Sequence, residues 1–533
     1  MRQDEEMIRG TVQTVVYQNP ENGYAVLRLH TEDGQQITVV GTVPMTVPGE
    51  RLIVTGKWGY HASHGRQFEA EFLERLMPET GNEIFAYLAS GAVKGIGEKT
   101  AEKILRLFGE RALEVLENDP EQLSQIPGIS RRKAMEIGES FRRQAGIRRL
   151  IEFLTLHRLP PELAVRLFRV YGDLAEDALR DDPYLLSDPY FGADFAAVDA
   201  FALELDVEAD DERRVEAGIL FELSYNLTNG HTFIPQNKLI PATAALLNLD
   251  SETIESGMER LDEQQRMVRS EVAGLTACYL PEFYEAECEV TERLVRMADL
   301  RIQPPARLEA MLRSIEEKRA IDYAASQMQA IRDAASCQLL LVTGGPGTGK
   351  TTVMTGILDL FDAMGLKTQL AAPTGRAAKR LSEVTGREAT TIHRLLEAQF
   401  DPDSGAMAFV HDEDEPLKCD AMIIDETSMV DLQLMTSLLK ALRPQCRLIL
   451  VGDPDQLPSV GAGNVFSDII RSGVAKTVCL TEIFRQARES LIVMNAHAVN
   501  HGELPVLTVK NKDFFFMKRR SGESVVQTIQ ELC

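Results

Sequence analysis

The sequence predicts a multidomain α/β protein in which a core with a parallel β-sheet follows a small N-terminal β-barrel and helical domains. Short β-branched runs separated by turn residues fill residues 1–76. Helical patterns interrupted by Gly and Pro follow them up to about residue 240. Strands and helices then alternate over residues 318–475, which is the pattern of a parallel sheet with helices on both faces.

Length and composition exclude several classes of protein. The 533 residues are enough for about three to five domains, and 44% hydrophobic with 26% charged residues is typical of a globular chain, not of a disordered or fibrous one. No apolar run approaches the roughly 18 residues of a membrane span, and the N-terminus lacks the apolar segment of a signal peptide. Seven scattered cysteines without a CxxC pair fit reduced thiols. We therefore predict a cytoplasmic protein without a membrane partner.

The charge is distributed unevenly. A net charge of −24 argues against a surface coated with nucleic acid but leaves room for a local basic channel. Residues 173–213 hold 14 acidic and 2 basic residues, whereas residues 126–149 hold 7 basic and 2 acidic ones. A polyanion would be attracted to the second stretch and repelled by the first.

Four evenly spaced β-branched runs within residues 1–76 predict the barrel. It is either of the oligonucleotide-binding type or an ordinary structural β-domain. Trp58, Tyr60 and Phe68 are available to stack on bases, but we expect them to fill the barrel instead.

Two glycine turns in residues 77–150 predict a helix-hairpin-helix region. Gly95 and Gly97 lie in VKGIG, and Gly128 lies in IPGIS. Glycine lets the backbone approach a DNA phosphate, and the helix that follows offers free N–H donors. The alternative is a glycine-capped turn that only packs one helix on another. The basic balance of residues 126–149 favours DNA binding.

The remaining boundaries follow from changes in pattern. Residues 151–240 are expected to form a second helical region, and residues 241–317 a winged-helix-like module or linker. Residues 318–475 are the parallel-sheet core. Residues 476–533 are expected to begin a second unit, with TVCLTEIF as its first strand, which is incomplete at Cys533.

The strongest motif is the glycine-rich loop Gly344–Thr351, which matches GxxxxGK[ST] in full between an apolar strand and an amphipathic helix. Its backbone N–H groups can surround phosphate oxygens at a helix N-terminus. We expect Lys350 to reach the β- and γ-phosphates and Thr351 to bind Mg²⁺. The predicted nucleotide-binding residues are Gly345, Pro346, Gly347, Thr348, Gly349, Lys350, Thr351 and Thr352.

Further candidates follow at the ends of later strands. Asp425 suits a metal ligand and Glu426 suits activation of the attacking water. Gln456 follows the next strand and can sense the γ-phosphate. Arg485 is a candidate arginine finger, with a surface salt bridge as the alternative.

Six ordered motifs resemble those of superfamily 1 helicases, and most closely the RecD-like branch that moves 5′ to 3′ on DNA. The N-terminal β-domain, the helical hairpins and NGHTFIP (229–235) also resemble the long N-terminal region of stand-alone RecD-like helicases. The six motifs are GGPGTGKTT (344–352), APTGRAAKRL (372–381), TIHRLL (391–396), IIDETSMVD (423–431), VGDPDQLPSVGAGNV (451–465) and LTEIFRQA (480–487).

The resemblance implies a RecA-like P-loop core that uses ATP and Mg²⁺ to move along single-stranded DNA and unwind duplex at single-strand/duplex junctions. It implies a monomer that acts in DNA repair or recombination. Gln327 would read the adenine, Asp425 would join Thr351 in holding Mg²⁺, Glu426 would be the catalytic base, and Arg485 the finger. The hairpin insert at 398–418 would be the wedge that splits the strands. The residues lining the single-strand path would be Pro373, Thr374, Arg376 and His393.

One departure from the family pattern concerns the C-terminal part. The family's later motifs, including a second arginine, do not occur before Cys533, so we expect a C-terminally truncated chain. Two alternatives stay open: a P-loop ATPase that remodels protein or DNA without unwinding, and a DNA-binding module without enzymatic activity.

Overall fold

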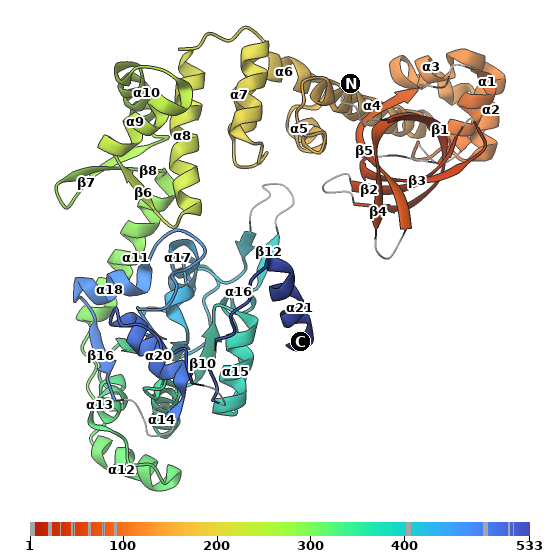
Figure 1. Ribbon diagram of the computed structural model, residues 1–533. Coiled ribbons are helices and arrows are strands. Elements are labelled where there is room, and N and C mark those ends of the chain that lie inside the picture. The colour runs from red at the N-terminus through yellow and green to blue at the C-terminus, as the bar shows by residue number, and fades with distance from the viewer. Residues whose placement is uncertain are drawn as a thin grey trace. The chain divides into compact units, whose positions relative to one another are not determined.

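The computed structural model divides the chain into two compact units, Met1–Gly218 and Ile219–Cys533 (Figure 1). No helix in the described part of the chain is both long enough and apolar enough to cross a membrane. The structure describes residues 6–19, 24–31, 33–43, 46, 48–61, 65–76, 78, 80–89, 93–400, 407–482, 489–509, 512–514 and 516–532.

The first unit opens with a closed barrel of five strands in the order β1-β2-β3-β5-β4 (Figure 1). Alternate apolar side chains, among them Val12, Leu27 and Val54, point inward and form its core, because successive side chains of a strand face opposite sides. The strands are β1 (Glu6–Gln18), β2 (Tyr24–Thr31), β3 (Gln36–Thr42), β4 (Arg51–His61) and β5 (Gly65–Leu76).

The aromatic residues of the barrel divide between its inside and its surface. Phe68 is fully buried, and Trp58 packs edge-on against it with 5.3 Å between the ring centroids. Tyr60 is 81% exposed, so the prediction that it fills the barrel is wrong. It lies near the end of β4, where the strand extends past the barrel core.

Helices make up the rest of the first unit. The first four of them share one hydrophobic core with the two glycine turns, which contribute Val93, Ile96, Ile126 and Ile129. The helices are α1 (Gly81–Ala89), α2 (Glu98–Phe108), α3 (Ala112–Asn118), α4 (Arg131–Leu156), α5 (Leu163–Tyr171), α6 (Ala175–Asp181) and α7 (Phe195–Glu204).

A buried ion pair joins the barrel to α4. Arg148 donates a hydrogen bond to the Glu50 carboxylate just before β4, and the two side chains are only 10% and 5% exposed. The Arg148 guanidinium also lies over the ring of Tyr87, 5.2 Å from its centroid. Removing one partner of such a pair leaves the other charge buried without its counter-ion, so the pair ties the two parts together.

The acidic stretch 173–213 uses several carboxylates within its own unit. Asp182 and Asp194 accept hydrogen bonds from backbone N–H groups at helix starts. Asp199 accepts from Nε and a terminal nitrogen of Arg214 at 2.8 and 2.9 Å. Part of the acidic excess in residues 173–213 therefore serves to cap helices and to pair with arginine inside the protein.

The second unit begins within a helical module that carries a small sheet. Its order of helix, strand, helix, helix, strand, strand is that of a winged-helix-like module, and its strands pair in the order β6-β8-β7. The boundary predicted between residues 240 and 241 is wrong, because a single helix crosses it. The elements are α8 (Glu212–Thr228), β6 (Phe233–Pro235), α9 (Gln236–Leu247), α10 (Ser251–Glu263), β7 (Val268–Val272) and β8 (Leu275–Tyr279).

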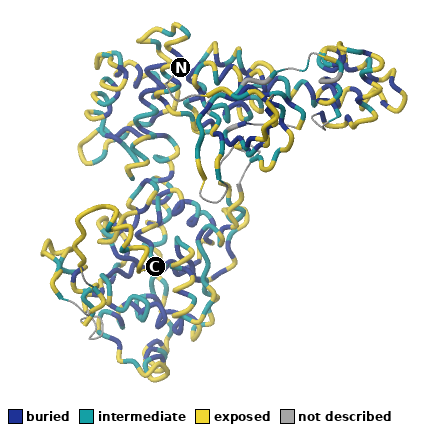
Figure 2. The backbone as a smooth tube through the Cα atoms, turned by 45° about the vertical axis from the view of Figure 1, so that its right-hand side comes forward, coloured by how far each residue is buried: buried dark blue, intermediate teal, exposed yellow. Residues whose placement is uncertain are grey.

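The core of the second unit is a six-stranded sheet in the order β11-β10-β14-β15-β9-β16, and every neighbouring pair is parallel. The central strands are buried on both faces (Figure 2). The strands are β9 (Leu339–Gly344), β10 (Thr368–Ala372), β11 (Ala389–Thr391), β14 (Ala421–Ile424), β15 (Arg447–Gly452) and β16 (Lys476–Leu480).

Helices cover both faces of this sheet. Leu339 and Leu341 of β9 pack with α11, α17 and α18, while Leu340 and Val342 pack with α12, α13 and α14. Alternate side chains of one strand thus contribute to the hydrophobic layers on opposite faces of the sheet. The helices in this part of the chain are α11 (Pro281–Asp299), α12 (Leu308–Arg319), α13 (Ala325–Ala334), α14 (Lys350–Ala363), α15 (Gly375–Thr385), α16 (Ile392–Leu395), α17 (Leu432–Lys440), α18 (Val465–Ser472), α20 (Leu491–Asn500) and α21 (Gly522–Leu532), of which α20 and α21 lie outside the two hydrophobic layers.

The strand predicted to open a second unit belongs to this sheet instead. β16 pairs in parallel with β9 from Lys476 to Leu480, so the boundary at residue 476 is wrong. An apolar strand that follows α18 finds its hydrogen-bond partners at the open edge of β9. Within the predicted insert at 398–418, β12 (Ala398–Phe400) and β13 (Met407–Phe409) form an antiparallel hairpin.

Candidate nucleotide and DNA site

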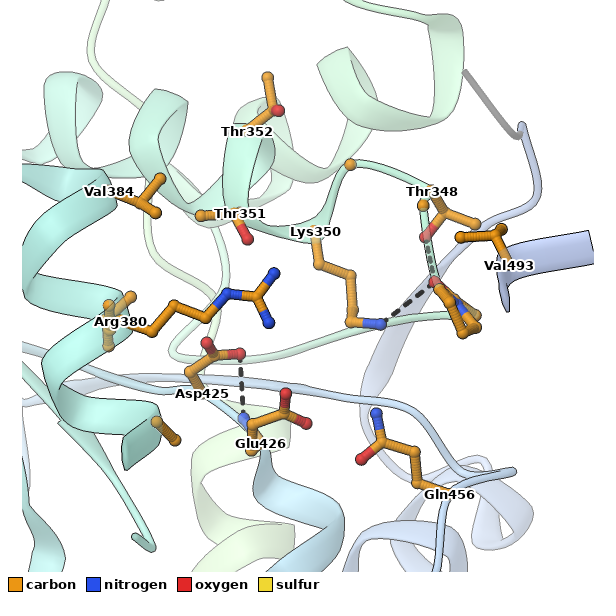
Figure 3. A pocket seen from close by; sticks show the side chains of 16 residues that line it. Thr348, Lys350, Thr351, Thr352, Arg380, Val384, Asp425, Glu426, Gln456 and Val493 are labelled. Atoms are coloured by element: carbon orange, nitrogen blue, oxygen red, sulfur yellow. Dashed lines mark hydrogen bonds between the residues drawn. The ribbon is translucent and has the colours of Figure 1, made fainter. Parts of the chain in front are cut away.

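A cavity of about 810 Å³ lies at the carboxyl ends of the central strands of the second unit (Figure 3). Parallel strands end at the same edge of a sheet, so residues that follow β9, β14 and β15 meet there. Its walls combine the glycine-rich loop, two acidic residues, one glutamine and one face of α15. The lining residues are Gly345, Pro346, Gly347, Thr348, Gly349, Lys350, Thr351, Thr352, Ala377, Arg380, Leu381, Val384, Asp425, Glu426, Gln456 and Val493.

The glycine-rich loop connects β9 directly to the start of α14. Gly347 and Gly349 have φ angles of +76° and +84°, which glycine adopts without steric cost. Nζ of Lys350 donates hydrogen bonds to the carbonyl oxygens of Gly344 and Gly345 at 2.5 and 3.2 Å. The lysine charge is therefore held within the loop, at the N-terminus of a helix, where an anion is favoured.

Two carboxylates meet at the end of β14. The backbone N–H of Glu426 donates to Oδ1 of Asp425 at 2.9 Å. Burial, and next the neighbouring Glu426 carboxylate, raise the pKa of Asp425 to about 6. Glu426 has a φ of +51°, and its Oε2 is buried without a hydrogen-bond partner among the described residues. A strained backbone and an unpaired carboxylate oxygen are typical of a functional position.

Gln456 reaches the cavity from a turn that follows β15. Its backbone N–H donates to the carbonyl oxygen of Asp453 at 3.2 Å, and the N–H of Asp455 donates to Oδ1 of Asp453 at 3.1 Å. Asp453 is 2% exposed, so the turn that carries Gln456 is anchored in the core.

Gln327 lies behind the loop and not in the cavity lining. Its amide nitrogen is 3.4 Å from the carbonyl oxygen of Thr348, and its Oε1 accepts from the N–H of Ala324 at 3.2 Å. It therefore joins α13 to the glycine-rich loop. Arg485, the predicted finger, lies outside the described residues.

Five lining residues are not among those that the sequence predicts: Ala377, Arg380, Leu381 and Val384 of α15, and Val493 of α20. Arg380 of α15 directs its guanidinium toward Asp425 (Figure 3) and favours the charged carboxylate, against the larger effect of burial. It lies four residues after Arg376, so its position on the same face of a helix was a usable signal. Val493 comes from α20, in the segment that was assigned to a separate unit.

The residues predicted for the single-strand path gather at the same edge of the sheet, after β10 and β11, which pair in parallel. Thr374 caps α15 by accepting from the N–H of Ala377 at 3.3 Å, and Pro373 precedes it. Arg376 is exposed, and the ring of His393 lies 6.0 Å from that of Phe409 in the hairpin. The structure thus connects the predicted path to the predicted wedge.

The two glycine turns of the first unit share one geometry. The N–H of Ile96 donates to the carbonyl of Val93 at 3.1 Å, and the N–H of Ile129 donates to that of Ile126 at 3.1 Å. Gly95 and Gly128 sit at the turn position that requires a positive φ, with values of +94° and +100°. Gly97 does not have this constraint, because it is the N-cap of α2 with a φ of −111°.

The basic stretch beside the second turn is partly neutralised. Arg131 pairs with Glu121 at 2.8 Å, Arg132 with Glu136 at 2.9 Å, and Arg149 with Glu117 at 2.9 Å, while Arg148 is the buried partner of Glu50. The count of seven basic and two acidic residues in 126–149 therefore overestimates the positive charge that is left for a ligand.

Four family models match parts of the chain. An AAA domain covers residues 327–462, and the OB-fold domain of the ATP-dependent DNA helicase YrrC covers residues 5–78. A SAM-like helix-hairpin-helix tandem covers residues 85–143, and the HHH domain of the ATP-dependent RecD2 DNA helicase covers residues 143–233. The predicted fold class is therefore confirmed, and the barrel is of the oligonucleotide-binding type.

Individual proteins are similar to this chain over different lengths. An "ATP-dependent RecD2 DNA helicase" of Deinococcus radiodurans is 32% identical over 515 residues, which is 93% of this chain and 70% of the relative. A "RecBCD enzyme subunit RecD" of Mycolicibacterium smegmatis is 40% identical over 200 residues, 33% of this chain and 35% of the relative. Among solved structures, the Pif1 helicase from Candida albicans is 23% identical, with a TM-score of 0.26, over 35% of this chain and 45% of that chain.

Proposed function

The chain belongs to the RecD2 family of ATP-dependent DNA helicases, and on that premise we propose that it moves 5′ to 3′ along single-stranded DNA and unwinds the duplex ahead. The proposal rests on one observation: the glycine-rich loop, Asp425, Glu426 and Gln456 all line the same cavity. Phosphate binding, water activation and sensing of the γ-phosphate need these groups within one site.

The residues of the cavity divide the work of hydrolysis. Lys350 and the loop N–H groups bind the β- and γ-phosphates. Glu426, whose Oε2 has no hydrogen-bond partner among the described residues, accepts the proton of the attacking water. Gln456 orients that water and reports the presence of the γ-phosphate. Gln327 reads the adenine, and Arg485 supplies the finger.

The donors present fit Mg²⁺. Thr351 offers a hydroxyl and Asp425 a carboxylate whose buried charge is costly without a cation, as its raised pKa shows. Mg²⁺ prefers oxygen ligands and takes only one or two from the protein beside those of the phosphates. When bound, it would neutralise the charge on the β- and γ-phosphates.

The DNA strand runs past Pro373, Thr374, Arg376 and His393, and the hairpin of β12 and β13 acts as the wedge. The support is the position of His393, whose ring lies beside that of Phe409. The two glycine turns of the first unit add contacts with phosphates that do not depend on base sequence. We place the enzyme in the cytoplasm, as a monomer that acts at single-strand/duplex junctions in DNA repair or recombination.

The proposal is tested by replacing the loop lysine. Lys350→Ala should reduce DNA-stimulated ATP hydrolysis to background and leave the affinity for single-stranded DNA within about twofold, because Lys350 contacts phosphate and not the strand. Lys367→Ala, at an exposed lysine of the same core, is the control. Hydrolysis at the wild-type rate in Lys350→Ala would refute the assignment of the site.

Direction and unwinding need partial duplexes with one single-stranded tail. A duplex with a 5′ tail should be separated in the presence of ATP, and one with a 3′ tail should not. ATP hydrolysis without strand separation on either substrate would favour a remodelling ATPase over the helicase mechanism.

A further inference from the structure

One face of α20 lies against two separate parts of the nucleotide site. Val493, His497 and Asn500 follow one another at intervals of four and three residues, which places them on the same side of the helix. Val493 lines the cavity beside Thr348 (Figure 3). The other two side chains contact the loops that carry the phosphate-binding and γ-phosphate-sensing groups.

His497 contacts the phosphate-binding loop. Its Nε2 donates a hydrogen bond to the carbonyl oxygen of Pro346 at 3.1 Å, since a carbonyl can only accept. The imidazole also lies directly on Gly345, because a Cβ at Gly345 would come 2.7 Å from Cε1 of His497. Gly345 therefore serves close packing as well as phosphate binding.

Asn500 contacts the turn of Gln456. Its Nδ2 donates to Oδ2 of Asp455 at 2.7 Å. Asp455 precedes Gln456 in a turn whose N–H groups at both positions bond to Asp453. A movement of Asp455 is thus passed to the backbone of Gln456.

The helix is capped at its N-terminus and held at its middle. Ser490 caps its N-terminus by accepting from the N–H of Val493 at 3.2 Å. Asn495 is 5% exposed and exchanges two hydrogen bonds with the backbone of Val506, at 2.8 and 3.1 Å. A helix held in this way transmits displacement as a rigid body.

We propose that α20 couples the phosphate-binding loop to the Gln456 turn, with His497 and Asn500 as positioning residues. His497 holds Gly345 and Pro346 in the conformation that receives the phosphates, and Asn500 holds the turn that senses them. The inference rests on the proposed ATPase function of the same site and adds the element that links its two halves.

The first test separates nucleotide binding from turnover. His497→Ala should weaken the affinity for a fluorescent ATP analogue about three- to tenfold, the effect of losing one hydrogen bond and its packing. His497→Gln, which keeps an N–H donor, should recover part of that affinity. His501→Ala is the matched control on the same helix, because in the described part of the chain the His501 ring bonds to the carbonyl of His497 and to neither loop. An affinity of His497→Ala equal to that of His501→Ala would overturn the proposal.

The second test addresses coupling. Asn500→Ala should leave nucleotide affinity within about twofold and lower the stimulation of kcat by single-stranded DNA about threefold or more. Asp455→Ala should do the same, and the double variant should be no worse than either single one. Additive effects would contradict a shared contact.

The two proposals fail in different ways. A wild-type chain without DNA-stimulated ATP hydrolysis would count against the proposed function. The affinity of His497→Ala relative to His501→Ala would still decide the role of α20, because it needs binding and no turnover.

Discussion

Asp425 and Glu426 have features that lower the stability of the folded protein. Burial and the adjacent carboxylate raise the pKa of Asp425 to about 6, and Glu426 combines a positive φ with a buried oxygen that lacks a partner in the described part of the chain. Each feature costs folding free energy. Such costs are tolerated where a phosphate, a cation and a water molecule are to be bound.

Arg376 and Arg380 lie one turn apart on α15 and allow a prediction at the residue scale, because Arg380 lines the cavity and Arg376 is the one proposed to contact DNA. Arg380→Ala should raise the KM for ATP about tenfold, which corresponds to a loss of about 1.4 kcal/mol in binding, since its guanidinium lies in the cavity near Asp425. Arg376→Ala should instead raise the DNA concentration needed for half-maximal stimulation.

Steady-state kinetics with ATP and single-stranded DNA varied separately distinguish these outcomes. If both variants changed the same parameter by the same factor, the division of α15 between nucleotide and DNA would be wrong.

At the scale of elements, α4 does more than follow the second glycine turn. Ser130 caps it by accepting from the N–H of Lys133 at 3.2 Å, and its second half carries Arg148 into the buried pair with Glu50. Its basic side chains form ion pairs with neighbouring acids, as Arg131 does with Glu121. One helix therefore links the barrel to the hairpin region and offers only part of its charge to a ligand.

Arg148→Met should destabilise the first unit by about 3–5 kcal/mol, because it leaves the Glu50 carboxylate buried without its guanidinium. The double variant Arg148→Met with Glu50→Leu should recover part of the loss, since both charges are then absent. Urea denaturation monitored by circular dichroism measures both. Arg132→Met, at an exposed ion pair of the same helix, should change stability by less than about 1 kcal/mol.

At the scale of the whole molecule, the chain consists of two compact units with separate cores. Calorimetry should therefore resolve more than one unfolding transition. A non-hydrolysable ATP analogue with Mg²⁺ should raise the midpoint temperature of one transition, because the cavity lies within the second unit. At about 100 times its Kd, the ligand should add about 2.7 kcal/mol to the free energy of unfolding of that unit.

Arg148→Met should lower the other transition. A single transition that shifts as a whole with nucleotide and with Arg148→Met would show that the two units unfold together. The measurement therefore tests the division of the chain as well as the location of the site.

Much of the site follows from local sequence. Lys350, Asp425, Glu426 and Gln456 each follow an apolar strand, and parallel strands of one sheet bring their carboxyl ends to one edge. The glycine-rich loop is recognisable by itself because its residues act on a phosphate through their own backbone. The barrel and the turns at Gly95 and Gly128 were predictable for the same reason, since alternation and positive φ are local requirements.

Only the tertiary structure decided which distant segments complete these local parts. β16 pairs with β9 through backbone hydrogen bonds that any strand can make. Arg148 forms its ion pair with Glu50, which lies 98 residues earlier in the chain. Arg380 and His497 acquire their positions from the packing of whole helices onto the sheet and the loop. The chemistry of each segment can be predicted from local sequence, because it depends on neighbouring residues. The partners of a segment depend on packing between parts far apart in the chain, which no local pattern encodes.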